Sequence, residues 1–177
     1  SRFRFRGRDA LFFVVIMLML LPFQVTMVPN VITLRAMGLL DTVWSVILPM
    51  TVAPFYIFLL RQYMVGLPND MIEAAQIDGA GHFKIFVEIM LPLIKSTIFA
   101  VFILLFIEYW NDYYTPMVFL PENPTMSYGL FLFQTDNKAS VPVQLSACLL
   151  ACLPILAVFV AFKDKIMSNV TMGGIKG

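Results

Sequence analysis

Charged residues are scarce in this 177-residue sequence, in which Asp, Glu, Lys and Arg together make up 13% of the chain. A soluble domain usually carries about 25%, whereas here hydrophobic residues reach 60% and the mean hydropathy is +0.85. A water-soluble globule of this size could not hide that much apolar surface, so we expect lipid to surround much of it. The composition predicts a membrane protein and excludes a soluble enzyme.

The residues that usually build metal, redox and nucleotide sites are also scarce. One His and two Cys leave little for a metal site, and a formal net charge of +1 provides no basic field for nucleic acid. The phosphate-binding pattern G-x-x-x-x-G-K-[ST] is absent from the sequence, and no nucleophile–base pair is visible. Cys148 and Cys152 lie four residues apart, which favours buried packing on one helix face over redox chemistry. The sequence therefore predicts no bound cofactor, no metal and no catalysis by this chain.

The most prominent feature of the sequence is a set of long apolar runs. Crossing a hydrocarbon core of about 30 Å takes about 20 helical residues, and four runs reach or approach that length. They lack the alternation of a membrane barrel strand, and internal prolines are tolerated in spanning helices. The predicted fold is all-α, a polytopic membrane helix bundle that forms a single domain over residues 1–177. The predicted spans are residues 10–28, 43–62, 91–112 and 141–162.

Positive charge lies mostly on one side of these spans. Ten of the twelve Lys and Arg residues precede the first span, follow the fourth or lie around the loop between the second and third. Only Arg35 and Lys138 lie in the other two loops. The positive-inside rule then places both ends of the chain, and the loop of residues 61–84, in the cytoplasm. An Arg-rich start before an apolar run is also typical of a signal peptide, but no A-x-A-like cleavage site follows this run.

The loop of residues 66–84, GLPNDMIEAAQIDGAGHFK, is the least apolar part of the interior of the chain. Asp70 followed by Glu73 matches a helix capping box, and Gly79 stands where a helix ends in a residue with positive φ. Gly81 supplies a second permissive position before the next span. The pattern predicts a short cytoplasmic helix over about residues 70–79. Either it is a capped connector, or its small residues let another protein approach closely.

The spacing within this loop resembles a known signature. Glu73-Ala74-Ala75 is followed after three residues by Gly79, after nine more by Ile89, and after one more by Leu91-Pro92. This order resembles the EAA motif of ABC importer permeases, and residues 78–80 match the Asp-Gly-Ala version of that motif.

Four other stretches resemble the carbohydrate-uptake branch of the binding-protein-dependent permeases, of the maltose-transporter second-permease type. These stretches are residues 38–42, 59–62, 110–112 and 173–177. Members of that family usually have six spans, so two N-terminal spans are expected to be missing from this chain. The resemblance implies a multi-pass protein of the bacterial cytoplasmic (inner) membrane, with both ends of this chain in the cytoplasm.

The resemblance also implies a role for the short helix. In the family, the EAA helix docks in a groove of a cytoplasmic ATPase and transmits its closure to the spans. Glu73 would then pair with a basic ATPase residue, and Gly79 would set the bend toward the third span. The implied ATPase-coupling residues are Glu73, Ala74, Ala75, Asp78, Gly79 and Gly81. A tail contact with the ATPase is implied for Gly173, Gly174, Lys176 and Gly177, for which a disordered end is the alternative.

A polar and aromatic cluster lies near the outer end of the third predicted span. Sugars suit such a surface, because their flat apolar faces stack on aromatic rings and their hydroxyls pair with amides and carboxylates. An aromatic belt at the membrane–water boundary is the alternative interpretation. The candidate translocation-path residues are Glu108, Trp110, Asn111 and Asp112.

The predicted function is a permease subunit of an ATP-driven importer for a sugar or oligosaccharide. The implied partners are a second homologous permease, an ABC ATPase dimer that holds ATP and Mg, an extracytoplasmic sugar-binding protein, the sugar and membrane lipid, with no nucleic acid. An ion-coupled secondary transporter would need carboxylates near the bilayer midplane, where only Glu108 and Asp112 are candidates. A non-transporting scaffold subunit fits the composition but leaves the loop signature without a purpose.

Overall fold

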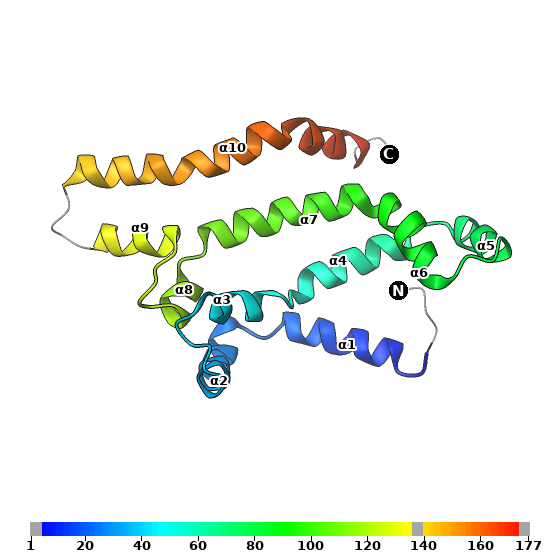
Figure 1. Ribbon diagram of the computed structural model, residues 1–177, viewed down its shortest axis with the longest axis horizontal. Helices are drawn as coiled ribbons and strands as arrows, with labels where there is room; N and C mark the ends of the chain where they lie inside the picture. Colours follow the sequence, from blue (N-terminus) through cyan, green and yellow to red (C-terminus); the bar gives the residue numbers. More distant parts are fainter. Residues whose placement is uncertain (1–4, 136–139, 174–177) are drawn as a thin grey trace. The chain divides into compact units, whose positions relative to one another are not determined.

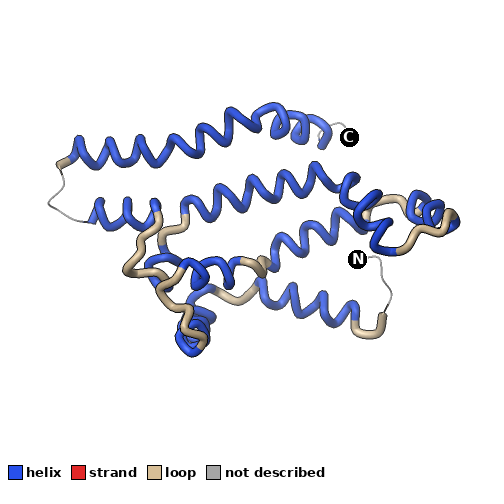
Figure 2. Tube along the Cα trace, viewed as in Figure 1, coloured by secondary structure: helices blue, strands red, loops and turns tan. Residues whose placement is uncertain are grey.

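The computed structural model describes residues 5–135 and 140–173, with side chains described up to residue 163, and it is helical without a strand in these residues (Figure 2). The all-α prediction is confirmed. The helices are α1 (Arg8–Met19), α2 (Phe23–Ala36), α3 (Val43–Met50), α4 (Pro54–Val65), α5 (Asp70–Ile77), α6 (His82–Ile85), the π-helical η1 (Phe86–Met90), α7 (Leu91–Asn111), α8 (Tyr114–Phe119), α9 (Met126–Thr135) and α10 (Val141–Gly173).

Three stretches of the described residues are long and apolar enough to cross a membrane: Val43–Val65, His82–Asn111 and Val141–Lys163. A fourth results if α1 and α2 are taken together as one broken span. The stretches overlap the four runs chosen from the sequence. The third begins at His82 rather than at residue 91, because α6 and η1 run into α7 without a break.

Two interruptions of the apolar runs lie just before a proline. A proline disfavours the helical conformation of the residue before it, and α1 ends shortly before Pro22. The predicted span of residues 10–28 is therefore divided between α1 and α2. The same effect separates α3 from α4, since Ala53 has an extended conformation (φ −106°, ψ 94°) before Pro54. Pro154, in contrast, lies inside α10 without ending it.

The chain divides into two compact units, one made of the residues up to Leu21 with Ala53–Ile103, the other of Pro22–Val52 with the residues from Leu104 onward. The first unit holds α1, α4, α5, α6, η1 and the first part of α7. The second holds the rest of α7 with α2, α3, α8, α9 and α10 (Figure 1). A single functional domain over residues 1–177 stays a prediction.

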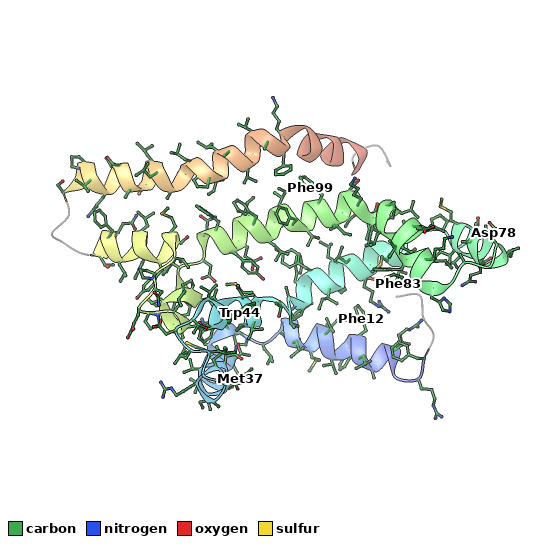
Figure 3. All side chains as sticks on the ribbon, in the orientation of Figure 1. Phe12, Met37, Trp44, Asp78, Phe83 and Phe99 are labelled. Carbon is green, nitrogen blue, oxygen red and sulfur yellow. The ribbon has the colours of Figure 1, made fainter. Side chains whose placement is uncertain are left out.

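In the first unit α1 packs along α4. The rings of Phe12 and Phe58 stack with their centroids 6.0 Å apart, and the Arg61 guanidinium lies 3.6 Å from the centroid of the Phe12 ring. A cation over an aromatic face is attracted by the ring quadrupole. Phe12, which is labelled in Figure 3, therefore joins α1 to α4 through its ring contacts with Phe58 and Arg61.

The core of the second unit lies around Phe119 at the end of α8. The Phe119 side chain is fully buried, and its ring meets that of Phe23 edge-on at 6.0 Å. Ser45 of α3 is also fully buried and donates its hydroxyl to the Phe119 carbonyl oxygen at 2.7 Å. This hydrogen bond satisfies a buried polar group that would otherwise be costly to desolvate.

Further hydrogen bonds join the loop after α2 to the loop after α8. The Asp41 N–H donates to the Phe119 carbonyl oxygen (2.9 Å), and Asp41 Oδ1 accepts the N–H of Glu122 (3.1 Å). Asp41 has a φ of +61°, a left-handed conformation that Asp tolerates better than most residues. We call this network, formed by Asp41, Ser45, Phe119 and Glu122, the Asp41 latch. It holds together two loops that are remote in the sequence.

Candidate functional site

The first candidate site is α5, in the connection between two apolar stretches. Asn69 is its N-cap residue, and the Asn69 carbonyl oxygen accepts the N–H groups of Ile72 (2.8 Å) and Glu73 (3.0 Å). The predicted capping box, with Asp70 as the N-cap, is therefore wrong by one residue. Asp70 and Glu73 both lie in the first turn of the helix, where the helix dipole favours a carboxylate.

Gly79 sets the end of α5. Its φ is +78°, in the left-handed region that glycine reaches without steric cost. The Gly79 N–H then donates to the Gln76 carbonyl (3.0 Å) and the Ala80 N–H to the Ala75 carbonyl (2.9 Å), which is the hydrogen-bond pair of a Schellman motif. The prediction that Gly79 ends this helix with a positive φ is confirmed. Gly81 differs, because its φ of −70° is open to any residue.

The backbone around Gly79 is open to a neighbour. Ala74 is exposed and Ala75 is half-buried. A β-carbon added at Gly79 or at Gly81 would meet no described atom of the chain within 4 Å. The described part of the chain therefore leaves room at this turn for a neighbour to approach closely.

The same connection exposes large apolar side chains. Ile77 is 86% exposed and Phe83 is 81% exposed, and Met71 is exposed as well. Glu73 and Asp78 are exposed beside them in the sequence, and Figure 3 shows Asp78 and Phe83 at the α5–α6 end of the first unit. Met71 and Ile77 lie between the two apolar stretches, and Phe83 is the second residue of the stretch His82–Asn111. Apolar side chains with carboxylates nearby, at the end of a span, favour contact with another protein.

The second candidate site is a cavity of about 450 Å³ in the second unit, between the end of α7, α9 and α10. Two of the four candidate translocation-path residues, Trp110 and Asn111, line it. The Trp110 indole N–H donates to the Ala151 carbonyl oxygen of α10 (3.2 Å), and the Trp110 carbonyl oxygen accepts the Ser127 hydroxyl of α9. These bonds fix Trp110 against both neighbouring helices.

The other two cluster residues have different surroundings. Asp112 Oδ1 accepts the N–H groups of Tyr114 (2.9 Å) and Thr115 (3.0 Å), so this carboxylate fixes the turn from α7 into α8. Glu108 is exposed on α7 and does not line the cavity. The structure thus brings Trp110 and Asn111 together in one cavity and leaves Glu108 and Asp112 outside it.

Sequence reasoning missed the opposite wall of this cavity. Phe131 and Gln134 of α9 line it, but α8 and two loops separate them from α7, and no sequence pattern connects them with Trp110. Cys148 and Cys152 share one face of α10, as their spacing indicates, and both line the cavity. The expectation of buried packing is wrong for both within this chain, because Cys148 is half-buried and Cys152 is exposed.

The predicted tail contact lies mostly outside the described residues. Gly173 is the last residue of α10, and Gly174, Lys176 and Gly177 follow the described part of the chain.

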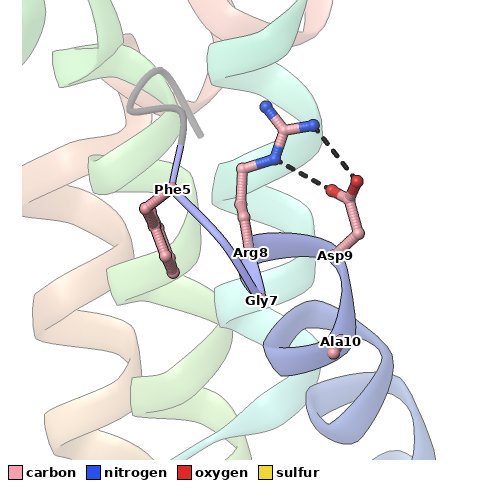
Figure 4. A pocket seen from close by; sticks show the side chains of 5 residues that line it. All are labelled: Phe5, Gly7, Arg8, Asp9 and Ala10. Atoms are coloured by element: carbon pink, nitrogen blue, oxygen red, sulfur yellow. Dashed lines mark hydrogen bonds and ion pairs between the residues drawn. The ribbon is translucent and has the colours of Figure 1, made fainter.

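A further cavity, of about 640 Å³, lies at the start of α1 (Figure 4). It is lined by Phe5, Gly7, Arg8, Asp9 and Ala10. The Arg8 guanidinium donates to the Asp9 carboxylate through Nε (2.9 Å) and Nη2 (3.4 Å). The two adjacent charges therefore compensate each other, and we assign no function to this cavity.

The apolar helices and the exposed helical connection between them define a polytopic helical membrane protein. Residues 1–170 match the family described as the binding-protein-dependent transport system inner membrane component, and the chain belongs to this family. The resemblance seen in the sequence is confirmed.

Curated bacterial relatives are similar over nearly the whole chain. The arabinooligosaccharides transport system permease protein AraQ of Halalkalibacterium halodurans is 34% identical over 98% of this chain and 63% of its own length. The lactose transport system permease protein LacG of Rhizobium radiobacter is 30% identical over 98% of this chain and 64% of its own length. The sn-glycerol-3-phosphate transport system permease protein UgpE of Rhizobium meliloti is 35% identical over 89% of this chain and 57% of its own length. The chain thus spans less than two-thirds of the length of these relatives.

One solved structure has the same fold. It is a crystal structure of a bacterial ABC transporter involved in the import of the acidic polysaccharide alginate, with a TM-score of 0.78 and 24% sequence identity. The match covers 93% of this chain and 64% of that chain. The predicted fold of an ABC importer permease is confirmed.

Proposed function

We propose that this chain is a permease subunit of an ATP-driven importer for a saccharide, and that α5 couples a partner ATPase to movement of the spans. One observation carries the proposal. A short helix with the EAA spacing, closed by a left-handed Gly79, lies between two apolar spans, and Ile77 at its end and Phe83 of the following α6 are exposed. Such a helix can enter a groove of another protein as a rigid unit.

The chemistry of α5 fits a groove that is apolar inside and basic at its rim. Ile77 and Phe83 supply apolar area, and Ala74 and Ala75 let the partner backbone approach closely. Glu73, in the first turn, offers a charge-assisted hydrogen bond to a basic residue. An ATPase that closes on its nucleotide would then pull on the helix that runs on from His82 to Asn111.

The remaining partners follow from the family and from the relatives. We infer a second, similar permease that completes the translocation path, a pair of ATPase subunits that hold ATP and Mg, and an extracytoplasmic binding protein. We also infer that α5 and both ends of this chain lie in the cytoplasm, as the Lys and Arg distribution predicts. Family membership favours this importer over an ion-coupled transporter or a scaffold subunit.

The experiment is co-purification of the full-length protein in mild detergent. We expect an ABC-type ATPase to accompany the wild type and to be lost or depleted with Glu73→Lys, because this change puts a positive charge against a basic rim. Glu122→Lys is the matched control, since Glu122 is also exposed but lies on the loop after α8. Absence of an ATPase from the wild-type preparation, or equal loss with both variants, would contradict the proposal.

Uptake by the purified assembly identifies the solute. The names of the relatives and of the solved structure suggest four probes: arabinotriose, lactose, sn-glycerol 3-phosphate and an alginate trisaccharide. Two of these are neutral and two are anionic, and we call them the solute panel. ATP-dependent accumulation of a panel member in proteoliposomes supports the importer. Accumulation driven by an ion gradient without ATP would favour the secondary transporter.

A further inference from the structure

The cavity between α7, α9 and α10 has the size and lining of a small-molecule site. Its volume of about 450 Å³ lies within the range of about 300–1,000 Å³ that is usual for such sites. All of its walls belong to the second unit. The lining combines aromatic rings with side-chain amides, contributed by Trp110, Asn111, Tyr113, Phe131 and Gln134.

Two of the rings stack on each other, so each can offer only its outer face to a ligand. Tyr113 and Phe131 stack with centroids 4.6 Å apart and an angle of 15° between their planes. Tyr113 is 41% exposed, so part of this pair stays open to a ligand. Aromatic faces of this kind attract the C–H face of a sugar ring, while the phenol hydroxyl supplies a polar end.

Two amides face the same cavity with hydrogen-bonding capacity to spare. Asn111 Nδ2 donates to the Ile107 carbonyl oxygen (2.7 Å), a contact that uses one of its two N–H bonds and leaves its carbonyl oxygen for another donor. Gln134 Nε2 lies 3.7 Å from Cys148 Sγ, a weak acceptor. Sugar hydroxyls both donate and accept, so they can pair with both ends of these amides.

The absence of charged residues from the described lining favours neutral solutes over anionic ones. Among the described residues that line the cavity, none carries a charge at neutral pH. A phosphate or carboxylate placed here would lose hydration without gaining a cationic partner, which is unfavourable. A neutral saccharide has no such cost.

We propose that this cavity is a subsite for neutral saccharides that discriminates against anionic solutes. The proposal rests on the importer function proposed above and adds the charge class of the solute and the residues that contact it. Tyr113 and Phe131 form the stacking platform. Asn111 and Gln134 bind the hydroxyls, and Trp110, fixed by Ala151 and Ser127, forms the back of the site.

The native thiols of the cavity provide the test. In the assembled complex with Cys148→Ala, the rate at which N-ethylmaleimide modifies Cys152 is followed by mass spectrometry of the peptide that contains it. A solute present at ten times its Kd should slow this reaction by about elevenfold, as expected for competitive occupancy. We expect the neutral members of the solute panel to protect Cys152 and the anionic members to leave its rate unchanged.

Two aromatic residues of α9 give a matched pair of variants. Phe131 lines the cavity, whereas Phe133 lies two positions away on the same helix and does not. Phe131→Ala should abolish protection and raise the KM for uptake of the neutral saccharide, while Phe133→Ala should change neither. Gln134→Leu, which keeps the size of the side chain but removes the amide, should behave like Phe131→Ala.

Three results would overturn the subsite: equal protection by anionic solutes, import of the anionic panel members alone, or a Cys152 that does not react even without solute. Uptake of a neutral saccharide that leaves Cys152 reactive and is insensitive to Phe131→Ala would also overturn it, with the importer function intact. Failure of the importer function itself would show separately, as a wild-type preparation that holds no ATPase.

Discussion

Two glycine turns with the same geometry lead into opposite surroundings. Gly38 (φ +68°) and Gly79 (φ +78°) end α2 and α5, each with the two hydrogen bonds of a Schellman motif. After Gly38, the chain is held by the Asp41 latch against the buried Phe119. After Gly79 it continues into α6 with Phe83 exposed.

The two turns have different roles: the turn after α2 stabilises the fold, and the turn after α5 is proposed to bind a partner. The loop after α2 satisfies its polar groups within the chain through the Asp41 latch, so the latch is explained by stability, although Met37, Val43 and Trp44 beside it are 60%, 62% and 57% exposed. The loop after α5 is equally well formed, and it ends in the same pair of Schellman hydrogen bonds. Exposed apolar side chains flank both turns, and those beside Gly79, Ile77 and Phe83, are the more exposed, which favours a surface that a partner completes.

The largest effect should come from Phe119→Ala. The ring is fully buried, so its removal should destabilise the protein by about 3–5 kcal/mol through lost contacts and a cavity. Phe83→Ala, at a side chain that is 81% exposed, should change stability by less than about 0.5 kcal/mol. Thermal unfolding of the full-length protein in one detergent measures both variants. Similar losses would contradict the contrast between the two turns.

A smaller loss is expected for the Asp41 series. Asp41→Ala removes the acceptor of the Glu122 N–H and strains the left-handed backbone, which together should cost about 1–3 kcal/mol. Asp41→Gly should lose less, because glycine accepts the positive φ. Asp41→Asn should lose least, because its amide oxygen can accept the same hydrogen bond. Unfolding midpoints ranked Asn, Gly, Ala from the most to the least stable support the latch, and a different ranking contradicts it.

The smallest predicted effect compares two glycines of one loop, and the quantity measured is the affinity for the ATPase. Gly79→Ala should strain the turn by about 1–2 kcal/mol, because alanine disfavours a positive φ. Since the ATPase binds the formed turn, this strain should weaken ATPase binding by about tenfold. Gly81→Ala should weaken binding by less than about twofold, because φ at Gly81 is ordinary and nothing crowds the added carbon. Titration of the ATPase onto the permease in nanodiscs measures both affinities. Equal losses would show that contact, rather than φ, determines the role of these glycines.

Much of α5 could be predicted from the sequence because its signals are local. The helix and the left-handed Gly79 follow from residues within a few positions of each other, and only the N-cap differs, lying at Asn69 instead of Asp70. The division of the first span by Pro22 also has a local cause, but the same residue type at Pro154 leaves α10 continuous. Whether a proline interrupts a span therefore depends on packing that the sequence does not display.

The long-range features could not be predicted. The Asp41 latch joins residues that are 81 positions apart, and no periodicity links them. The cavity combines Trp110, taken from a cluster visible in the sequence, with Gln134 of α9, which looks like an ordinary helix residue. In both cases tertiary packing of the helices brings residues that are remote in the sequence together.

Hydrogen–deuterium exchange in nanodiscs, with and without the co-purified ATPase, tests the central claim most directly. We predict slower exchange at residues 70–83 when the ATPase is bound, because α5 and the turn after it become covered. Exchange at residues 37–44 and 119–124 should stay unchanged, because the Asp41 latch already satisfies that region within the chain. Unchanged exchange at residues 70–83, or protection that appears at residues 119–124 instead, would contradict the assignment of α5 as the coupling surface.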